Sequence, residues 1–315
     1  MAINPTFIQN IIDGNRAMVA RAISIVENEH ADAIKLLCEL FPHTGKAYRI
    51  GITGPPGAGK STITNKLAKL YRSGNRRVGI IAVDPTSPFT GGALLGDRVR
   101  MTDVEMDEGV FIRSMASRGS LGGLSRKASE AADILDASGC DIILMETVGV
   151  GQSELDIASA ADTTVVVLVP ESGDSIQAMK AGLMEIADFF VVNKSDRAGA
   201  DQAVMSIKMV LNFRKREDGW LPDVLQSTAN DGTGIDKIVE MIARHRKFLT
   251  GGNLLEKKRE GNIAGRIREL IADRLRIEFW NEERKRALGA KLPDISSRLI
   301  TPYDVAEKLI ENFKK

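Results

Sequence analysis

A glycine-rich stretch that ends in a lysine and a hydroxyl residue offers the clearest chemistry in the sequence. It matches the pattern G-x-x-x-x-G-K-[ST] and consists of Gly54, Pro55, Pro56, Gly57, Ala58, Gly59, Lys60 and Ser61. A loop of this composition between a strand and a helix can turn successive backbone N–H groups toward a phosphate, and the helix N-terminus adds partial positive charge. We therefore assign the stretch and Thr62 to phosphate binding, with Lys60 on the β- and γ-phosphates and Ser61 on Mg2+.

Acidic residues farther along the chain could supply the remaining magnesium ligands. Glu146 ends an apolar run, and the Thr-Val-Gly that follows gives the shape of the D-x-x-G element of GTPases, with Glu in place of Asp. In that element Gly149 would let a backbone N–H face the γ-phosphate, and Glu146 would take part in catalysis through the metal. Asp84 and Asp97 lie in segments rich in Pro and Gly, where each could simply cap a turn. We interpret both as reaching the Mg2+ region, one directly and one through water.

A third cluster of polar residues indicates the base of the nucleotide. Asn193, Lys194 and Asp196 follow an apolar run as N-K-x-D. The carboxylate of Asp196 could accept hydrogen bonds from N1–H and the 2-amino group of guanine together, whereas adenine offers no such pair of donors. Lys194 could stack its aliphatic stem over the ring, and Asn193 could pin the loop. The sequence therefore favours GTP over ATP. Backbone N–H groups after the next apolar run would face guanine O6, and they belong to Ser227, Thr228 and Ala229.

Seven short apolar runs alternate with helical stretches and must position these loops. Most of the runs are too uniformly apolar for a half-exposed sheet, so we expect helices on both faces. Strands that alternate with helices favour right-handed βαβ units. The sequence therefore predicts an α/β fold, a P-loop NTPase with a mostly parallel central sheet flanked by helices. The predicted strands are Tyr48–Thr53, Val78–Asp84, Val110–Arg113, Asp141–Thr147, Thr163–Val169, Phe189–Asn193 and Val224–Ser227.

Helical extensions flank the predicted GTPase domain, which we place at residues 46–250. Residues 1–45 are predicted to form an N-terminal helical extension, since apolar residues recur there at three- and four-residue steps. Residues 251–315 are predicted to form a C-terminal arm with an apolar stripe amid charged residues. The stripe could pack against its own domain or pair two subunits, and its long polar faces favour a homodimer. It consists of Ile263, Ile267, Leu270, Ile271 and Leu275.

The composition narrows the class of protein. The 315 residues carry 43 Lys and Arg against 42 Asp and Glu, a net charge of +1, which argues against a nucleic-acid partner attracted by a global positive field. Two distant cysteines and three scattered histidines argue against a disulfide framework and a zinc finger. Apolar runs such as Val165–Pro170 are far shorter than the roughly 20 residues that span a bilayer, and we find no signal-peptide pattern. We expect a cytoplasmic protein with no membrane or nucleic-acid partner.

The motifs in combination resemble those of the methylmalonyl-CoA mutase-associated GTPases of the MeaB/ArgK type. The similarity covers about residues 45–250, and the flanking helices fit the layout of the family. The phosphate loop and N-K-x-D occur in many GTPases, whereas the stretches that begin with Asp84-Pro85 and Glu146-Thr147 are more distinctive. The segments that carry the resemblance are residues 54–61, 83–88, 90–92, 96–98, 146–154, 170–182 and 193–196.

The resemblance implies a function and several residue roles. Members of this family are homodimers joined through C-terminal helices. They act as GTP-dependent chaperones of the adenosylcobalamin enzyme methylmalonyl-CoA mutase, which they protect from inactivation and whose cofactor loading they gate. The client here would be that mutase or a related acyl-CoA mutase. The family has also carried the label of a kinase for amino-acid transport proteins. Residues 171–182 fall on an additional mobile loop of the family, and its Mg2+ positions fall on Ser61, Asp84, Asp97 and Glu146.

The sequence departs from many GTPases beside the D-x-x-G-like element. Val150 stands where they place a Gln that orients the attacking water, and Gln152 lies nearby but out of step. We therefore predict slow intrinsic turnover that a partner accelerates, an effect that can reach about 10³–10⁵-fold. Lys180 is a candidate catalytic residue that would enter the site with the partner bound, as are Arg98 and Glu154, although solvated loop charges are an equally good interpretation.

Three other classes of protein remain as alternatives. A metal-delivery GTPase would tend to carry His- or Cys-rich stretches, which this sequence lacks. A kinase would transfer phosphate to an acceptor, but nothing in the sequence resembles a site for a protein substrate. A nucleotide-dependent structural dimer would hydrolyse GTP negligibly.

Overall fold

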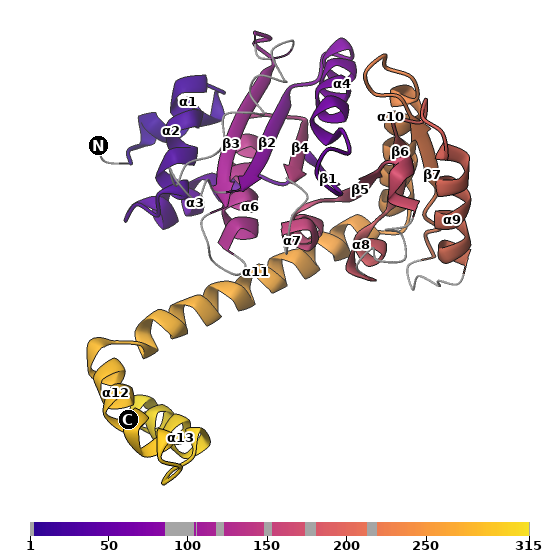
Figure 1. Ribbon diagram of the computed structural model, residues 1–315. Helices are drawn as coiled ribbons and strands as arrows, with labels where there is room; N and C mark the ends of the chain where they lie inside the picture. Colours follow the sequence, from indigo (N-terminus) through magenta and orange to yellow (C-terminus); the bar gives the residue numbers. More distant parts are fainter. Residues whose placement is uncertain are drawn as a thin grey trace. The chain divides into compact units, whose positions relative to one another are not determined.

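The computed structural model describes residues 3–85, 104, 106–117, 123–147, 153–173, 181–212 and 219–314. Seven strands form one sheet in the order β3-β2-β4-β1-β5-β6-β7, and each neighbouring pair is parallel (Figure 1). The predicted α/β fold with a parallel central sheet is confirmed. The strands are β1 Tyr48–Thr53, β2 Val78–Pro85, β3 Val110–Ser117, β4 Ile142–Thr147, β5 Thr163–Leu168, β6 Phe189–Asn193 and β7 Val224–Ser227.

The strand boundaries agree with the sequence at most positions. β1, β6 and β7 begin and end as predicted, and β2, β4 and β5 differ by one residue at one end. The prediction was wrong for β3, which runs on from Arg113 to Ser117. The extension arises because β3 pairs with β2 without interruption as far as the pair Pro85–Ser117, so backbone hydrogen bonding carries the strand past its apolar part.

Helices cover both faces of the sheet, as the uniformly apolar strands require (Figure 1). On one face, α4 Lys60–Ser73 and α10 Ile235–Gly251 pack against alternate residues of the strands, such as Ile50 and Ile52. The opposite face meets α6 Gly123–Ala137 and α7 Ser153–Ala160, and a separate cluster there holds β5 and β6 against α8 and α9. Helix α8 is Ala181–Ile186 and helix α9 is Ala200–Asn212. The strands β4, β5 and β6 are therefore buried on both sides, which fixes the positions of the loops at their ends.

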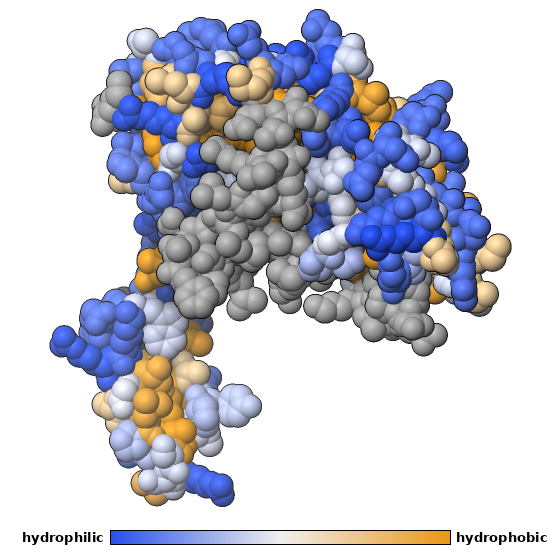
Figure 2. All heavy atoms as spheres, turned by 45° about the horizontal axis from the view of Figure 1, so that its top comes forward, coloured by the Kyte–Doolittle hydropathy of each residue, from blue (hydrophilic) through white to orange (hydrophobic). Residues whose placement is uncertain are grey.

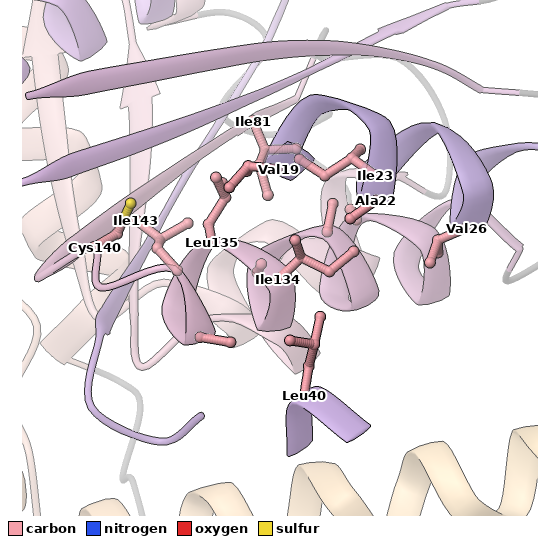
Figure 3. Packing of buried hydrophobic residues seen from close by; sticks show 14 of the residues in the cluster. Val19, Ala22, Ile23, Val26, Leu40, Ile81, Ile134, Leu135, Cys140 and Ile143 are labelled. Carbon is pink, nitrogen blue, oxygen red and sulfur yellow. The ribbon is translucent and has the colours of Figure 1, made fainter. Parts of the chain in front are cut away.

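The N-terminal helices share a core with the sheet. Figure 3 shows apolar side chains of α2, among them Val19 and Ile23, directed toward Ile134 and Leu135 of α6. Asn4 and Asn15 cap α1 and α2, since each side chain accepts a hydrogen bond from the backbone N–H three residues on. These helices therefore belong to the same compact unit as the sheet, Met1–Arg259. They are α1 Pro5–Ile12, α2 Arg16–Glu27 and α3 Ala33–Leu40, followed by the short η1 Phe41–His43.

A buried polar network holds the edge of the sheet at which the strands begin. His245 is 1% exposed and shares a hydrogen bond of 2.8 Å with Thr163 at the start of β5. The guanidinium of Arg259 donates to both carboxylate oxygens of Asp162, at 2.8 and 2.7 Å. The carboxylate of Asp162 also accepts from the backbone N–H of Arg49, at 2.9 Å. These polar residues are thus satisfied within the fold, and they fasten the amino ends of β1 and β5.

The C-terminal helices form a second compact unit, Glu260–Lys315. In it the ring of Phe279 packs edge-on against Phe313 with centroids 5.3 Å apart, and Val305 and Leu309 are buried. The predicted stripe lies on α11 with all five side chains 43–54% exposed. Figure 2 shows hydrophobic atoms gathered along one face of this unit. Among the described helices, none combines the length and the hydropathy that crossing a membrane would need. This unit holds α12 Glu282–Ser296, α13 Pro302–Lys314 and the part of α11 Leu254–Phe279 that follows Arg259.

Candidate nucleotide-binding site

The glycine-rich loop leaves β1 at Thr53 and enters α4 at Lys60, so it lies at the carboxyl edge of the sheet. Two of its glycines have no room for a side chain. A Cβ atom on Gly54 would lie 2.0 Å from the carbonyl oxygen of Val167, and one on Gly59 would lie 2.3 Å from Nδ2 of Asn193. Both glycines also have positive φ angles, 132° and 89°, which side chains disfavour. The loop conformation thus depends on glycine at these two positions.

Lys60 lies over this loop. Its ammonium donates hydrogen bonds to the carbonyl oxygens of Gly54, at 2.8 Å, and Pro55, at 2.9 Å. Lys60 is only 5% exposed, so solvent screens the charge of its ammonium less than it would at the surface. Thr62 lies in the first turn of α4 and is partly exposed. The structure thus brings a cation and a helix N-terminus to one place, which is the arrangement that attracts a phosphate.

Ser61 and Glu146 meet beneath the loop. The Ser61 hydroxyl donates to Oε1 of Glu146 at 2.5 Å, and both residues are buried. A hydroxyl and a carboxylate are the hard oxygen ligands that Mg2+ prefers, so this pair fits the ion. The main chain of Asp84 lies on β2 next to β4, near the same edge, since Val83 is paired with Thr147. No group of three or more His, Cys, Asp or Glu residues that could hold a metal occurs among the described residues.

Some predicted site residues lie outside the described part of the chain. These are Asp97, Arg98, Gly149 and Lys180, together with the side chains of Asp84 and Glu154. Their roles stay predictions.

Asn193 connects three loops at the end of β6. Its amide nitrogen donates to the carbonyl oxygen of Ala58 in the phosphate loop, at 2.8 Å. Its amide oxygen accepts from the Ser227 hydroxyl, at 3.1 Å, and from the backbone N–H of Ala229, at 3.0 Å. The side chain is 3% exposed, so these bonds are shielded from water. The phosphate loop and the loop after β7 are therefore fastened to each other through one amide group.

Lys194 and Ser195 add two further connections. The Lys194 ammonium donates to the carbonyl oxygen of Gly57 at 2.8 Å, and its backbone has φ 57°, which turns the chain sharply after β6. The Ser195 hydroxyl lies 3.2 Å from Oγ1 of Thr228, within hydrogen-bonding distance. Asp196 follows with an exposed side chain. The structure thus gathers the N-K-x-D stretch and residues 227–229 beside the phosphate loop.

A contact that the sequence did not reveal lies beside this loop. Arg197 donates to the carboxylate of Glu171 at 2.6 Å, and this hydrogen bond lowers the pKa of Glu171. Glu171 belongs to η3 Pro170–Gly173, a short helical turn after β5. Nothing in the spacing of residues 171 and 197 indicates their contact, because it depends on the parallel pairing of β5 with β6.

The comparison with known protein families identifies the family of the chain. The family model described as methylmalonyl Co-A mutase-associated GTPase MeaB matches residues 19–284, which include the phosphate loop, Glu146 and the N-K-x-D stretch. The chain belongs to the MeaB family. The predicted resemblance is confirmed, and the chain is a GTPase of the P-loop NTPase fold.

Individual relatives resemble this MeaB-family chain over nearly its whole length. A Pyrococcus abyssi protein to which GTPase activity is ascribed is 45% identical over 307 residues, covering 96% of this chain and 95% of the relative. The mouse mitochondrial methylmalonic aciduria type A homolog is 35% identical and covers 96% of this chain and 78% of its own. A crystal structure described as that of an LAO/AO transport system kinase superimposes with a TM-score of 0.79 at 30% identity, covering both chains completely.

Proposed function

We propose that this MeaB-family GTPase binds and hydrolyses GTP with Mg2+ in the cytoplasm, as a chaperone of adenosylcobalamin-dependent methylmalonyl-CoA mutase or a related acyl-CoA mutase. It would protect the mutase from inactivation and gate the loading of its cofactor. The family description names that mutase, and the name of the mouse relative refers to methylmalonic aciduria. The observation that carries the nucleotide part of the proposal is the bonding of Asn193 to both the phosphate loop and the loop after β7.

Residues of the chain divide into three roles in this proposal. The phosphate loop, Thr62 and Gly149 hold the phosphates, and Asn193, Lys194, Asp196 and residues 227–229 hold guanine. Ser61, Asp84, Asp97 and Glu146 hold Mg2+, which when bound neutralises charge on the phosphate oxygens. The residues assigned to catalysis are Lys60, Glu146 and Lys180.

GTP hydrolysis depends mainly on the positioning of the phosphates and on the neutralisation of their negative charge. The loop N–H groups and the Lys60 ammonium fix the β- and γ-phosphates and favour the negative charge that gathers on them during hydrolysis. Because Lys60 is already bonded to two loop carbonyls, its ammonium need move little to reach a phosphate oxygen. Val150 brings no group that could orient the attacking water, so we expect slow turnover without a partner.

We also propose that the chain forms a homodimer through its C-terminal helices. α11 has no buried residue in the described chain, and its apolar stripe stays exposed. Exposed apolar surface that continues over several helical turns is typical of an interface. The proposal predicts twice the chain mass in light scattering, and a monomer at micromolar concentration would contradict it.

One alternative function has an observation in its favour. A solved structure that matches the whole chain is described as a transport-system kinase. A kinase would transfer the γ-phosphate to a protein, whereas a GTPase transfers it to water. Labelled GTP should therefore yield free phosphate alone under our proposal, and label on a protein acceptor would favour the kinase.

The mutase client is tested by retention from a lysate of the native cell. The full chain is immobilised with a non-hydrolysable GTP analogue, with GDP or without nucleotide, and retained proteins are identified by mass spectrometry. We expect a cobalamin-dependent mutase subunit whose amount changes with the nucleotide, because the nucleotide state would set the loops that face the client. Absence of any such mutase in all three states would contradict the chaperone role but leave the GTPase assignment intact.

A further inference from the structure

Two consecutive residues of β4 are bonded to the two ends of the phosphate loop. At the end that follows the loop, the Ser61 hydroxyl donates to Glu146 at 2.5 Å. At the end that precedes it, Oγ1 of Thr53 and Oγ1 of Thr147 share a hydrogen bond of 2.9 Å. Neighbouring residues on a strand project to opposite faces of the sheet. The end of β4 thus holds the loop from both faces.

The Thr53–Thr147 bond begins where the backbone pairing of these strands stops. The register of β1 with β4 runs from Tyr48 opposite Ile142 to Ile52 opposite Glu146. The two hydroxyl groups lie one residue beyond that last pair. Their side chains belong to residues that are 0% and 2% exposed, so water does not compete for the bond. A side-chain hydrogen bond therefore links β1 to β4 at the level of the phosphate loop.

A hydrogen bond sets a shorter separation than an apolar contact would. Two hydroxyl oxygens approach to 2.9 Å here, whereas two methyl carbons come to rest at about 3.5–4.0 Å. Replacing the hydroxyl pair by methyl groups would therefore move the strand ends apart by up to about 1 Å. A displacement of that size at a reacting centre can change a rate by about 100-fold.

We propose that Thr53 and Thr147 are positioning residues that set the distance between the phosphate loop and Glu146. The inference rests on the proposed nucleotide and Mg2+ roles of the loop and Glu146. Thr53 directly precedes Gly54, and Thr147 directly follows Glu146, so the bond joins the two segments at the points where they enter the site. The pair acts through these neighbours and touches no reacting atom.

The test separates positioning from a contribution to stability. Thr53→Val and Thr147→Val each remove one hydroxyl and leave the other one buried without this hydrogen bond, so each should lower the melting temperature. The double variant Thr53→Val/Thr147→Val removes both hydroxyls in groups of the same shape, and its melting temperature should return close to that of the wild type. If the pair serves stability alone, nucleotide binding should recover along with the melting temperature.

The readout is the affinity for fluorescent GDP measured in EDTA and in Mg2+. In EDTA, where the distance to Glu146 does not matter, we expect the double variant to bind fluorescent GDP as tightly as the wild type does. Mg2+ should raise the affinity of the double variant by a factor about tenfold smaller than the factor by which it raises that of the wild type. Thr147→Ser keeps the hydroxyl and should keep the full gain. A full Mg2+ gain in the double variant, or its loss in Thr147→Ser, would overturn the inference.

Two controls keep the result interpretable. If the wild type itself binds no guanine nucleotide, the proposed function of the loop fails. If the wild type binds and the double variant shows the same Mg2+ gain in GDP affinity, only the positioning role fails. Circular dichroism shows whether each variant folds. Should the double variant not fold, Thr147→Ala against Thr147→Ser makes the same comparison, and equal Mg2+ gains in these two would refute the positioning role.

Discussion

Replacing Lys60 by alanine is expected to lower the affinity for GTP about 100-fold or more and to abolish measurable hydrolysis. The ammonium is buried over the phosphate loop, where it would bond both the β- and the γ-phosphate. Hydrogen bonds to charged groups contribute about 1.5–3 kcal/mol each, and two of them amount to at least two decades in affinity. Isothermal titration with GTP and a phosphate-release assay measure the two effects.

The matched control for that variant is Lys69→Ala. Lys69 lies on the same helix, α4, but its side chain is exposed. The Lys69→Ala variant should bind and hydrolyse GTP as the wild type does. That result would show that removing a lysine from this helix does not by itself impair GTP binding or hydrolysis. Wild-type turnover in Lys60→Ala would remove the loop from its assigned role.

Asp196→Asn is expected to reduce the preference for GTP over ATP by about 100-fold or more. The carboxylate would accept from two donors on guanine, and sites that read such groups discriminate by up to about 10⁴–10⁵-fold. An amide can offer only its oxygen to those donors, and its NH2 group then faces a donor. The same NH2 group could donate to the 2-oxo group of xanthine, so xanthosine triphosphate should gain affinity as GTP loses it.

Competition binding of GTP, ATP and xanthosine triphosphate measures this change of preference. Asp236→Asn serves as the control, because Asp236 is an exposed carboxylate in the first turn of α10, close in the sequence to the loop after β7. An unchanged ratio of GTP to ATP affinity in Asp196→Asn would show that the base is read by other groups.

The sequence predicted the sheet well where burial alone decides the structure. β6 is an apolar run that ends at a polar motif, and β1 alternates Arg49 and Gly51 with buried isoleucines directly before the glycine-rich loop, so both boundaries were visible in the residues. β3 was predicted too short because its second half, with Ser114 and Ser117, is not an apolar run. Its strand conformation comes from pairing with β2, and a one-dimensional pattern does not contain that pairing.

The candidate site likewise contains residues that the sequence predicted and contacts that it did not. The phosphate loop, Glu146 and Asn193 could be named from motifs, because phosphate and base recognition demand those residue types at those places. Thr53–Thr147, Ser195–Thr228 and Glu171–Arg197 could not, since each contact joins residues that are far apart in the sequence. Threonine is common in strands for its shape alone, so neither member of the first pair stood out. Their meeting follows from the order and register of β1 and β4.

A guanine nucleotide held in the cage formed by the phosphate loop, Lys60 and the loops joined by Asn193 is the basis of every role assigned to this chain. Calorimetric titration of the folded full chain with GTP in the presence of Mg2+ tests it most directly. We predict saturable heat at one site per chain, and far weaker binding of ATP under the same conditions. Folded protein that gives no heat with GTP, or that binds ATP equally well, would contradict it.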